Sequence, residues 1–358
     1  RTNIMTKKTV LVGLDGATFT LLDPFMEQGV MPFLKSFAER GVRAELRSVV
    51  PPLTPPAWTT VLTGHSPGQH GIFDFFQADG PGSTAIRLAT SGDVQVDHVA
   101  QVVNRSGLRA TVVNFPVHFP PLAIDGVIIA GWMPWRQLRL GCHPPDLYDR
   151  LKQLPDFNPR ELAMDMALEA RATEGCDEAE YVEWAGLHTR REERWLEVLS
   201  YLMDSEPSQL TAVLLDGPDK VQHLCWRFLD PALWPAQPTA EEVRIREASI
   251  SYYRRLDSIL AALVAKAGPD ATVVMVSDHG FGATTEVFHV NSWLEQAGYL
   301  AWSQDVAAEL DEGDTLGMGH LSRHSRWLDW DRTTAYVSTP TSNGIHIVRA
   351  EQHEGRGV

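Results

Sequence analysis

The feature that most constrains the fold of this chain is a set of short, unbroken apolar runs. Most of them end abruptly at an aspartate, an asparagine or a serine, and they occupy residues 9–14, 110–113, 126–130, 210–215 and 271–276. Continuous apolar runs of this length are typical of strands that are buried on both faces of a sheet. Amphipathic helical patterns separate them, most clearly at 190–203 and 240–266. The alternation predicts an α/β fold in which a mostly parallel central sheet is flanked by helices.

The length of 358 residues suits one large α/β domain, with or without an inserted subdomain. We therefore expect a single catalytic domain over residues 1–358. The ranges 133–208 and 226–245 are richer in charged residues, tryptophan and proline than the rest of the chain, and we expect them to form cap-like insertions over the site.

Acidic residues follow three of the apolar runs, at Asp15, Asp216 and Asp278. In an open parallel sheet, ligands bind beyond the carboxyl ends of the strands. These carboxylates should therefore converge on one rim of the sheet, which is the first indication of a functional site.

The overall charge helps to exclude some classes of partner. The formal net charge is -15, and a nucleic-acid groove would need a stripe of Lys and Arg to neutralise phosphates. A small phosphorylated substrate stays compatible with this charge, because bound divalent cations can reverse the sign of the local potential.

No apolar run approaches the roughly 20 residues of a membrane span. The three cysteines are far apart in the sequence, which favours a reducing compartment, and we expect a cytoplasmic protein.

The segment around Thr54 has the composition of a helix start. Proline is favoured in a first helical turn, threonine is a good N-cap, and glycine ends helices. We therefore expect Thr54 to cap a helix of about ten residues that stops near Gly64. Backbone N–H groups near Pro56 and Ala57 could then stabilise a bound anion. A threonine hydroxyl is a poor nucleophile unless a metal or a base activates it.

Two further motifs have the residue types of metal ligands. Asp219 and His223 are four residues apart, so a helix would place both on one face, although an ordinary surface turn remains an alternative. Asp278 and His279 directly follow a buried strand, where their polar groups are costly unless something satisfies them. A carboxylate beside an imidazole suits Zn²⁺ or Mn²⁺.

The order of these motifs resembles that of the type I phosphodiesterase/nucleotide pyrophosphatase branch of the alkaline phosphatase superfamily. The stretch 63–72, Thr-Gly-His-Ser-Pro-Gly-Gln-His-Gly-Ile, is also similar to the segment that follows the nucleophile in that branch. The later stretch 291–300 resembles its bacterial predicted phosphohydrolases. The resemblance implies an alkaline-phosphatase-like fold and metal-dependent hydrolysis of a phosphodiester or a phosphomonoester.

The resemblance also implies a role for each residue. Thr54 would attack phosphorus and form a phospho-enzyme intermediate, which water would then hydrolyse. Two divalent ions, Zn²⁺ first and Mn²⁺ second, would be bound. The implied ligands of the first ion are Asp15, Thr54, Asp278 and His279, and those of the second are Asp219 and His223.

The sequence departs from the family pattern in two places. The family's second ion has a third ligand, a histidine late in the chain, whereas this sequence stops at Val358. Three interpretations stay open: the C-terminal part of the family fold is absent from this sequence, another histidine substitutes, or the second site is incomplete. Phe75 stands where nucleotide pyrophosphatases have an asparagine, so a nucleotide substrate does not follow. The candidate substitutes for the late histidine are His289, His320, His324 and His353.

Two other functions remain open on this evidence. One is a non-catalytic relative that binds a phosphorylated ligand with an incomplete second metal site. The other is a phosphotransferase that uses the same nucleophile with an alcohol acceptor. Sulfatases are disfavoured because they need a cysteine or serine at position 54, and cofactor-independent phosphoglycerate mutases because they use serine.

Overall fold

The structure is a computed structural model, and it describes residues 7–79, 86–163, 176–303, 327–339, 342 and 344–349. The chain divides into two compact units. Unit 1 comprises Arg1–Gly71 and Thr90–Ala283, and unit 2 comprises Ile72–Ala89 and Thr284–Val358. The single catalytic domain expected from the sequence stays a prediction.

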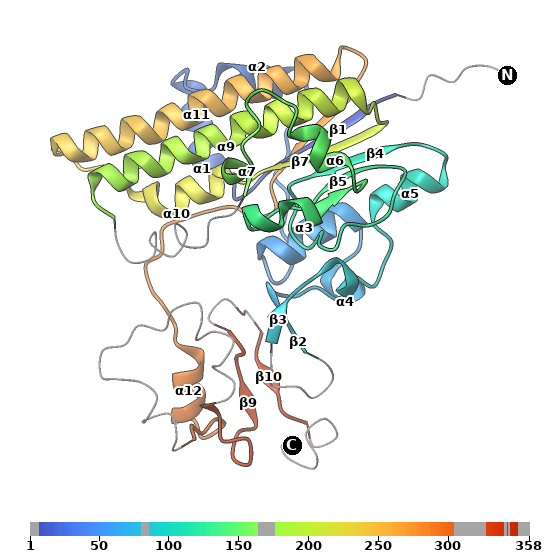
Figure 1. Cartoon of the computed structure of the whole chain (residues 1–358). Helices are drawn as coiled ribbons and strands as arrows, with labels where there is room; N and C mark the ends of the chain where they lie inside the picture. The colour runs from blue at the N-terminus through green and yellow to red at the C-terminus, as the bar shows by residue number, and fades with distance from the viewer. Residues whose placement is uncertain are drawn as a thin grey trace. The chain divides into compact units, whose positions relative to one another are not determined.

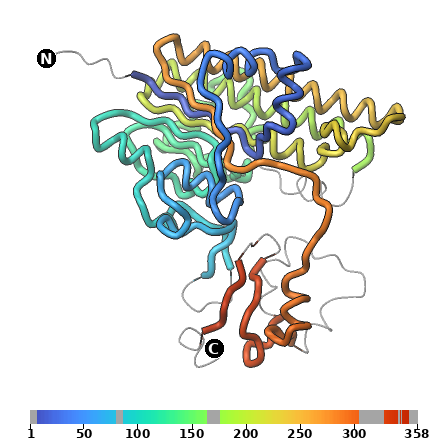
Figure 2. The backbone as a smooth tube through the Cα atoms, turned by 180° about the vertical axis from the view of Figure 1, so that it is seen from behind, coloured from blue at the N-terminus to red at the C-terminus, as the bar shows by residue number. Residues whose placement is uncertain are grey.

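Unit 1 is built on a six-stranded sheet with the strand order β6-β5-β4-β7-β1-β8. Neighbouring strands are parallel except for the edge pair β5 and β6, which is antiparallel. In the view of Figure 2, the early strand β1 runs beside the late strand β8. Each predicted apolar run forms one strand, so the predicted α/β class is confirmed. The strands are β1 (Thr9–Leu14), β4 (Ala110–Val113), β5 (Gly126–Ile129), β6 (Cys142–His143), β7 (Leu210–Leu215) and β8 (Thr272–Val276).

Helices cover both faces of this sheet (Figure 1). On one face, α9, α10 and α11 pack with α1 and α2 over side chains such as Leu14 and Leu215. On the other face, α3 and α5 pack over Val112 and Leu214. The α-helices in the described part of unit 1 are α1 (Phe19–Glu27), α2 (Pro32–Arg40), α3 (Thr54–Thr63), α4 (Pro67–His70), α5 (Val99–Arg105), α6 (Leu147–Leu151), α7 (Pro159–Leu162), α9 (Glu178–Ser205), α10 (Gly217–Leu229) and α11 (Ala240–Ala267).

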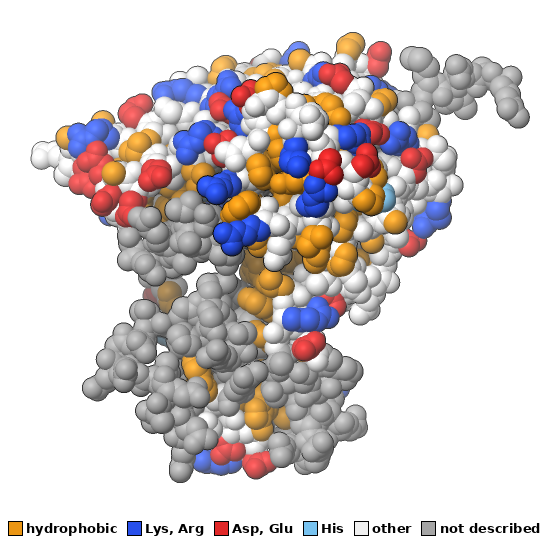
Figure 3. All heavy atoms as spheres, viewed as in Figure 1, with side chains coloured by type: hydrophobic (Ala, Val, Ile, Leu, Met, Phe, Trp, Pro, Cys, Tyr) orange, Lys and Arg blue, Asp and Glu red, His pale blue; other side chains and the backbone are white. Residues whose placement is uncertain are grey.

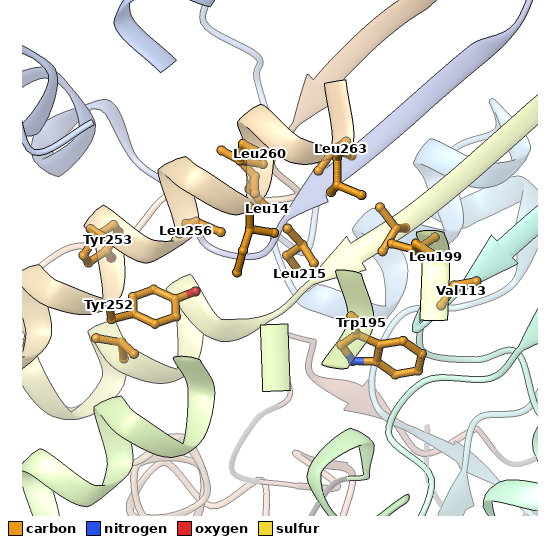
Figure 4. Close-up of a cluster of buried hydrophobic side chains, with 14 of the residues drawn as sticks. Leu14, Val113, Trp195, Leu199, Leu215, Tyr252, Tyr253, Leu256, Leu260 and Leu263 are labelled. Carbon is orange, nitrogen blue, oxygen red and sulfur yellow. The ribbon is translucent and has the colours of Figure 1, made fainter. Parts of the chain in front are cut away.

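The larger of the two cores lies between the sheet and the long helices α9 and α11. Figure 4 shows Leu14 and Leu215, from the ends of β1 and β7, pointing towards Leu256 of α11 and its neighbours. Trp195 of α9 is fully buried in the same cluster. The packing holds the carboxyl ends of β1 and β7 rigidly, and these ends lead directly into the acidic residues of the rim.

Parts of the two ranges expected to be cap-like belong to the sheet and the larger core of unit 1. Strand β6 extends the sheet, and α9 buries Trp195 and Leu199 against it. Residues 164–175, within the first range, lie outside the described part of the chain. A covering role for 133–208 and 226–245 stays a prediction.

The described residues of unit 2 form two small antiparallel strand pairs and one α-helix. Strand β2 (Phe76–Ala78) pairs with β3 (Ile86–Leu88), and β9 (Ala335–Tyr336) pairs with β10 (His346–Ile347). Helix α12 (Val290–Gln296) contributes Leu294 to a small apolar cluster with Leu300 and Leu328. Within the described residues of both units, no helix is long and apolar enough to cross a membrane.

Candidate active site

Three acidic side chains meet beyond the carboxyl ends of adjacent strands. Strand β1 lies between β7 and β8 in the sheet, and all three are parallel. Asp15 directly follows β1, Asp278 follows β8, and Asp219 lies in the first turn of α10, which follows β7. All three are less than a tenth exposed. Strand order therefore brings together residues that are far apart in the sequence, as predicted for Asp15 and Asp278. The third carboxylate expected there, Asp216, instead accepts a hydrogen bond from the Trp132 indole over 3.2 Å and lies 3.8 Å from a guanidinium nitrogen of Arg191.

Each of the two carboxylates after β1 and β8 has one oxygen held and one oxygen free. The indole N–H of Trp58 donates to Asp15 Oδ2 over 3.3 Å. The backbone N–H of Gly16 donates to Asp278 Oδ1 over 3.1 Å. The remaining oxygens, Asp15 Oδ1 and Asp278 Oδ2, are buried and accept no hydrogen bond from the described residues. Because one oxygen is fixed, the other is oriented.

His279 faces these two free oxygens. Its Nε2 lies 3.5 Å from Asp15 Oδ1 and 3.2 Å from Asp278 Oδ2. Its Nδ1 lies 2.8 Å from the carbonyl oxygen of Gly280, to which an Nδ1–H donates. A neutral ring with that tautomer presents the Nε2 lone pair to two carboxylate oxygens, which is unfavourable unless a cation lies among them. Asp15, Asp278 and His279 offer ligand atoms that all lie within 4.8 Å of one another.

Thr54 adds a hydroxyl to this group. Its Oγ1 lies 3.1 Å from His279 Nε2, and the side chain is buried to 7 % exposure. It is the first residue of α3, which ends at Thr63 with Gly64 as its C-cap, as predicted. The prediction that Thr54 caps the helix is wrong, since the cap residue is Leu53, with no side-chain hydrogen bond.

The neighbouring residues explain this difference. A cap at Thr54 would have to accept from the N–H of Pro56 or Ala57, the second and third residues after it. Pro56 has no N–H, and the N–H of Ala57 donates to the carbonyl oxygen of Leu53. The hydroxyl of Thr54 is thereby left available to the site. The expected anion-binding N–H groups near Pro56 and Ala57 are also wrong, because proline has none and the N–H of Ala57 donates to Leu53 within the helix.

Asp219 and His223 share one face of α10, as their spacing predicts. His223 Nε2 lies 3.4 Å from Asp219 Oδ2, and the imidazole is largely exposed. Asp219 Oδ1 is buried and has no hydrogen-bond partner among the described residues. A Cβ atom placed on Gly16 would lie 3.0 Å from that oxygen. The pair therefore borders the Asp15–Gly16 turn.

The crowding of carboxylates affects their protonation. Burial, together with the charges of Asp278 and Asp219, raises the pKa of Asp15 well above its ordinary value. Burial raises the pKa of Asp278 to about 6. Burial also acts to raise the pKa of Asp219, but the hydrogen bond and charge of His223 outweigh it, and the pKa is lowered. Three inward carboxylates with unpaired oxygens and an inward imidazole fit divalent cations, whose charge offsets this repulsion.

The third ligand of a second ion cannot be assigned from the described residues. Of the four histidines considered, His289 is exposed and belongs to unit 2. The other three, His320, His324 and His353, lie outside the described residues.

Sequence reasoning missed the groups that hold the carboxylates. Trp58 is four residues after Thr54, so a helix starting at Thr54 places both side chains on one face. That spacing could have indicated the indole as a neighbour of the site. The role of the Gly16 N–H had no such local signal, because its acceptor is 262 residues away in the sequence.

The chain also matches the model of a known protein family. The family described as type I phosphodiesterase/nucleotide pyrophosphatase matches residues 9–354, which include all the residues of the rim. The chain belongs to this family. A comparison with curated proteins finds no match.

Solved structures give a more distant likeness. Phosphonoacetate hydrolase from Sinorhizobium meliloti 1021, in complex with phosphonoacetate, is 20% identical with a TM-score of 0.49, over 82% of this chain and 62% of that one. A putative sulfatase from Bacteroides thetaiotaomicron is 13% identical with a TM-score of 0.46, over 77% of this chain and 59% of that one. The chain thus spans about three fifths of the length of these structures.

Proposed function

We propose that this member of the family hydrolyses a small phosphoric ester, either a phosphodiester or a phosphomonoester, with Thr54 as the nucleophile. The observation that carries the proposal is the position of the Thr54 hydroxyl, 3.1 Å from His279 Nε2 at the edge of the cluster of unpaired carboxylate oxygens. A hydroxyl without an activating neighbour is a poor nucleophile. Here it lies beside the groups that suit a divalent cation.

The residues divide into two ligand sets. Asp15, Asp278 and His279, with the Thr54 oxygen, would hold one divalent ion. Asp219 and His223 would contribute to a second. Zn²⁺ is the first candidate and Mn²⁺ the second, since mixed carboxylate and imidazole ligands suit both. When bound, such ions lower the pKa of a hydroxyl and neutralise charge on phosphoryl oxygens.

The chain's own groups account for the order of bond changes. The Thr54 oxygen gives up its proton and forms a bond to phosphorus, while the bond from phosphorus to the leaving oxygen breaks and that oxygen takes up a proton to leave as an alcohol. A water oxygen then attacks the phosphothreonine and loses a proton, the bond between phosphorus and Thr54 breaks, and the Thr54 oxygen regains a proton. Trp58 and Gly16 keep Asp15 and Asp278 in fixed orientations throughout, because each donates to one carboxylate oxygen.

The charge distribution supports a small substrate. Among the described residues on the face of unit 1 drawn in Figure 3, Lys and Arg side chains are interspersed with Asp and Glu and form no continuous stripe. With a net charge of -15, such a surface is unsuited to a polyanionic nucleic acid.

The test compares Thr54→Ala with Thr54→Ser and with the control Thr63→Ala. The Thr63 hydroxyl bonds to the Thr59 carbonyl in the same helix and is not part of the site. Zinc-loaded protein would be assayed with bis-p-nitrophenyl phosphate and with p-nitrophenyl phosphate. We expect Thr54→Ala to lose activity, Thr54→Ser to retain part of it, and Thr63→Ala to match the wild type. Activity that survives in Thr54→Ala would refute the proposal.

Product analysis separates the remaining alternatives. If added alcohols receive the phosphoryl group in preference to water, the protein is a phosphotransferase. If the wild-type protein turns over neither ester but binds phosphate with zinc present, a non-catalytic binding role replaces the enzymatic one.

A further inference from the structure

A buried carboxyl group that the proposed chemistry does not use lies against the first turn of α10. Glu192 of α9 has no exposed surface. Its Oε1 accepts the backbone N–H of Gly217 over 2.8 Å, and the hydroxyl of Tyr252 donates to the same oxygen over 3.3 Å. One carboxyl oxygen therefore joins α9, α10 and α11.

This contact replaces the usual cap of a helix. The residue at the cap position of α10 is Asp216, and its side chain makes no capping hydrogen bond. The first N–H groups of a helix have no partner within the helix and need one from outside. Glu192 supplies it for Gly217, from another helix.

Position 217 also has to be glycine for this contact to form. A Cβ atom there would lie 2.3 Å from the Tyr252 hydroxyl and 2.5 Å from Glu192 Oε1. Both distances are far below a normal contact. The close approach of the carboxyl group to the backbone therefore depends on the absence of a side chain.

The same segment is held at a second point. The side-chain amide of Gln222 donates to the carbonyl oxygen of Gly16 over 2.9 Å. The N–H of Gly16 in turn donates to Asp278. Asp219 lies between these two attachments, at positions 217 and 222. The segment that carries Asp219 is therefore tied to α9 at one end and to the turn after β1 at the other.

Such attachment has a physical reason. Asp15, Asp219 and Asp278 repel one another when they are ionised, and the charges of Asp219 and Asp278 both act on Asp15. Repulsion would move the first turn of α10, which carries Asp219, away from the other two carboxylates unless something held it. The hydrogen bond from Gly217 to Glu192 opposes that movement.

We propose that Glu192 is a positioning residue that sets the place of Asp219 relative to Asp15 and Asp278, and so the affinity of the second ion. The inference rests on the proposed two-ion function. Groups that orient metal ligands typically change metal affinity by about 10- to 100-fold when they are removed.

The test is zinc titration of chelator-stripped full-length protein by isothermal titration calorimetry, with folding checked by near-ultraviolet circular dichroism. Glu192→Met removes the acceptor at similar size, whereas Glu192→Gln keeps an oxygen that can accept the Gly217 N–H. The matched control is Glu193→Met, one residue along α9, where the side chain pairs with Arg255 instead. Asp219→Asn reports whether the second ion depends on Asp219.

We expect two ions in the wild type, in Glu193→Met and in Glu192→Gln, and at least about tenfold weaker binding of one ion in Glu192→Met. If Glu192→Met does not fold, Glu192→Asp serves in its place, because the shorter side chain withdraws the acceptor from Gly217. Unchanged affinities in the folded variant, with one ion lost in Asp219→Asn, overturn the inference and leave the two-ion proposal standing. If Asp219→Asn binds zinc as the wild type does, the two-ion proposal fails, and this inference fails with it.

Discussion

The buried position of Glu192 has a consequence for stability that can be worked out from its surroundings. Burial, with the nearby charge of Asp216, raises the pKa of the Glu192 carboxyl from its ordinary 4.5 to about 8, although Arg191 and the Gly217 N–H act in the opposite direction. Tyr252 also faces the group and donates a hydrogen bond that lowers the pKa. The carboxyl group is therefore protonated in the folded protein at neutral pH and ionised in the unfolded chain.

The sign of the pH effect follows from proton binding. Between pH 4.5 and 8 the folded state binds more protons at this group than the unfolded state, so the contribution to stability falls as pH rises. Each pH unit within this window is worth up to about 1.4 kcal/mol for a single group. Over the interval from pH 5 to pH 8 the loss amounts to about 3 kcal/mol.

The perturbation is Glu192→Gln, which keeps an acceptor for Gly217 but cannot ionise. We expect the free energy of unfolding of the variant to exceed that of the wild type by an amount that grows by about 3 kcal/mol from pH 5 to pH 8. The assay is urea unfolding of both proteins at several pH values, followed by tryptophan fluorescence. Taking the difference between the two proteins cancels the titration of all other groups. Parallel pH curves for the two proteins would refute the reasoning.

Three further predictions concern the rim. Gly16→Ala should destabilise the protein and weaken zinc binding, because the backbone φ of Gly16 is +62° and the new Cβ would lie 3.0 Å from Asp219 Oδ1. The control is Gly29→Ala, where φ is +72° but the space around the new Cβ is open. It should lower the free energy of unfolding only by the backbone strain of about 1–2 kcal/mol. Trp58→Phe should weaken binding of the first ion about 10- to 100-fold by calorimetry, whereas the control Trp195→Phe should not. In protein stripped of metal with a chelator, the contribution of Asp278 to stability should fall as pH rises from about 4 to about 6, because its pKa is raised to about 6. The melting temperature of the stripped wild type should therefore fall relative to that of stripped Asp278→Asn over this range, and parallel pH curves for the two proteins would contradict the prediction.

Much of the architecture could be predicted from local sequence patterns. The five apolar runs form β1, β4, β5, β7 and β8, because a strand buried on both faces needs a continuous apolar stretch. Asp15, Asp216 and Asp278 were predicted to meet because they follow three such runs, and the structure brings Asp15 and Asp278 together while Asp216 contacts Trp132 and Arg191. A helix of about ten residues that stops near Gly64 was also predicted, although Thr54 is its first residue and not its cap.

Other features required the tertiary structure. The sequence has no pattern for the short strand β6, whose two residues gain their partners only at the sheet edge. It also cannot indicate which oxygen of each carboxylate is free, since that depends on donors such as the Gly16 N–H, which lies 262 residues from its acceptor.

The sequence by itself determined the fold class, the order of the motifs and the residue types at the rim, because strand burial and helix starts are encoded over a few neighbouring residues. Only the tertiary structure decided how those residues are held. The order of strands brings Asp15 and Asp278 together, and a fully buried carboxyl of α9 reaches Gly217 at the start of α10. Hydrogen bonds of this kind join segments that are distant in the chain, so their partners exist only once the sheet and its helices have packed.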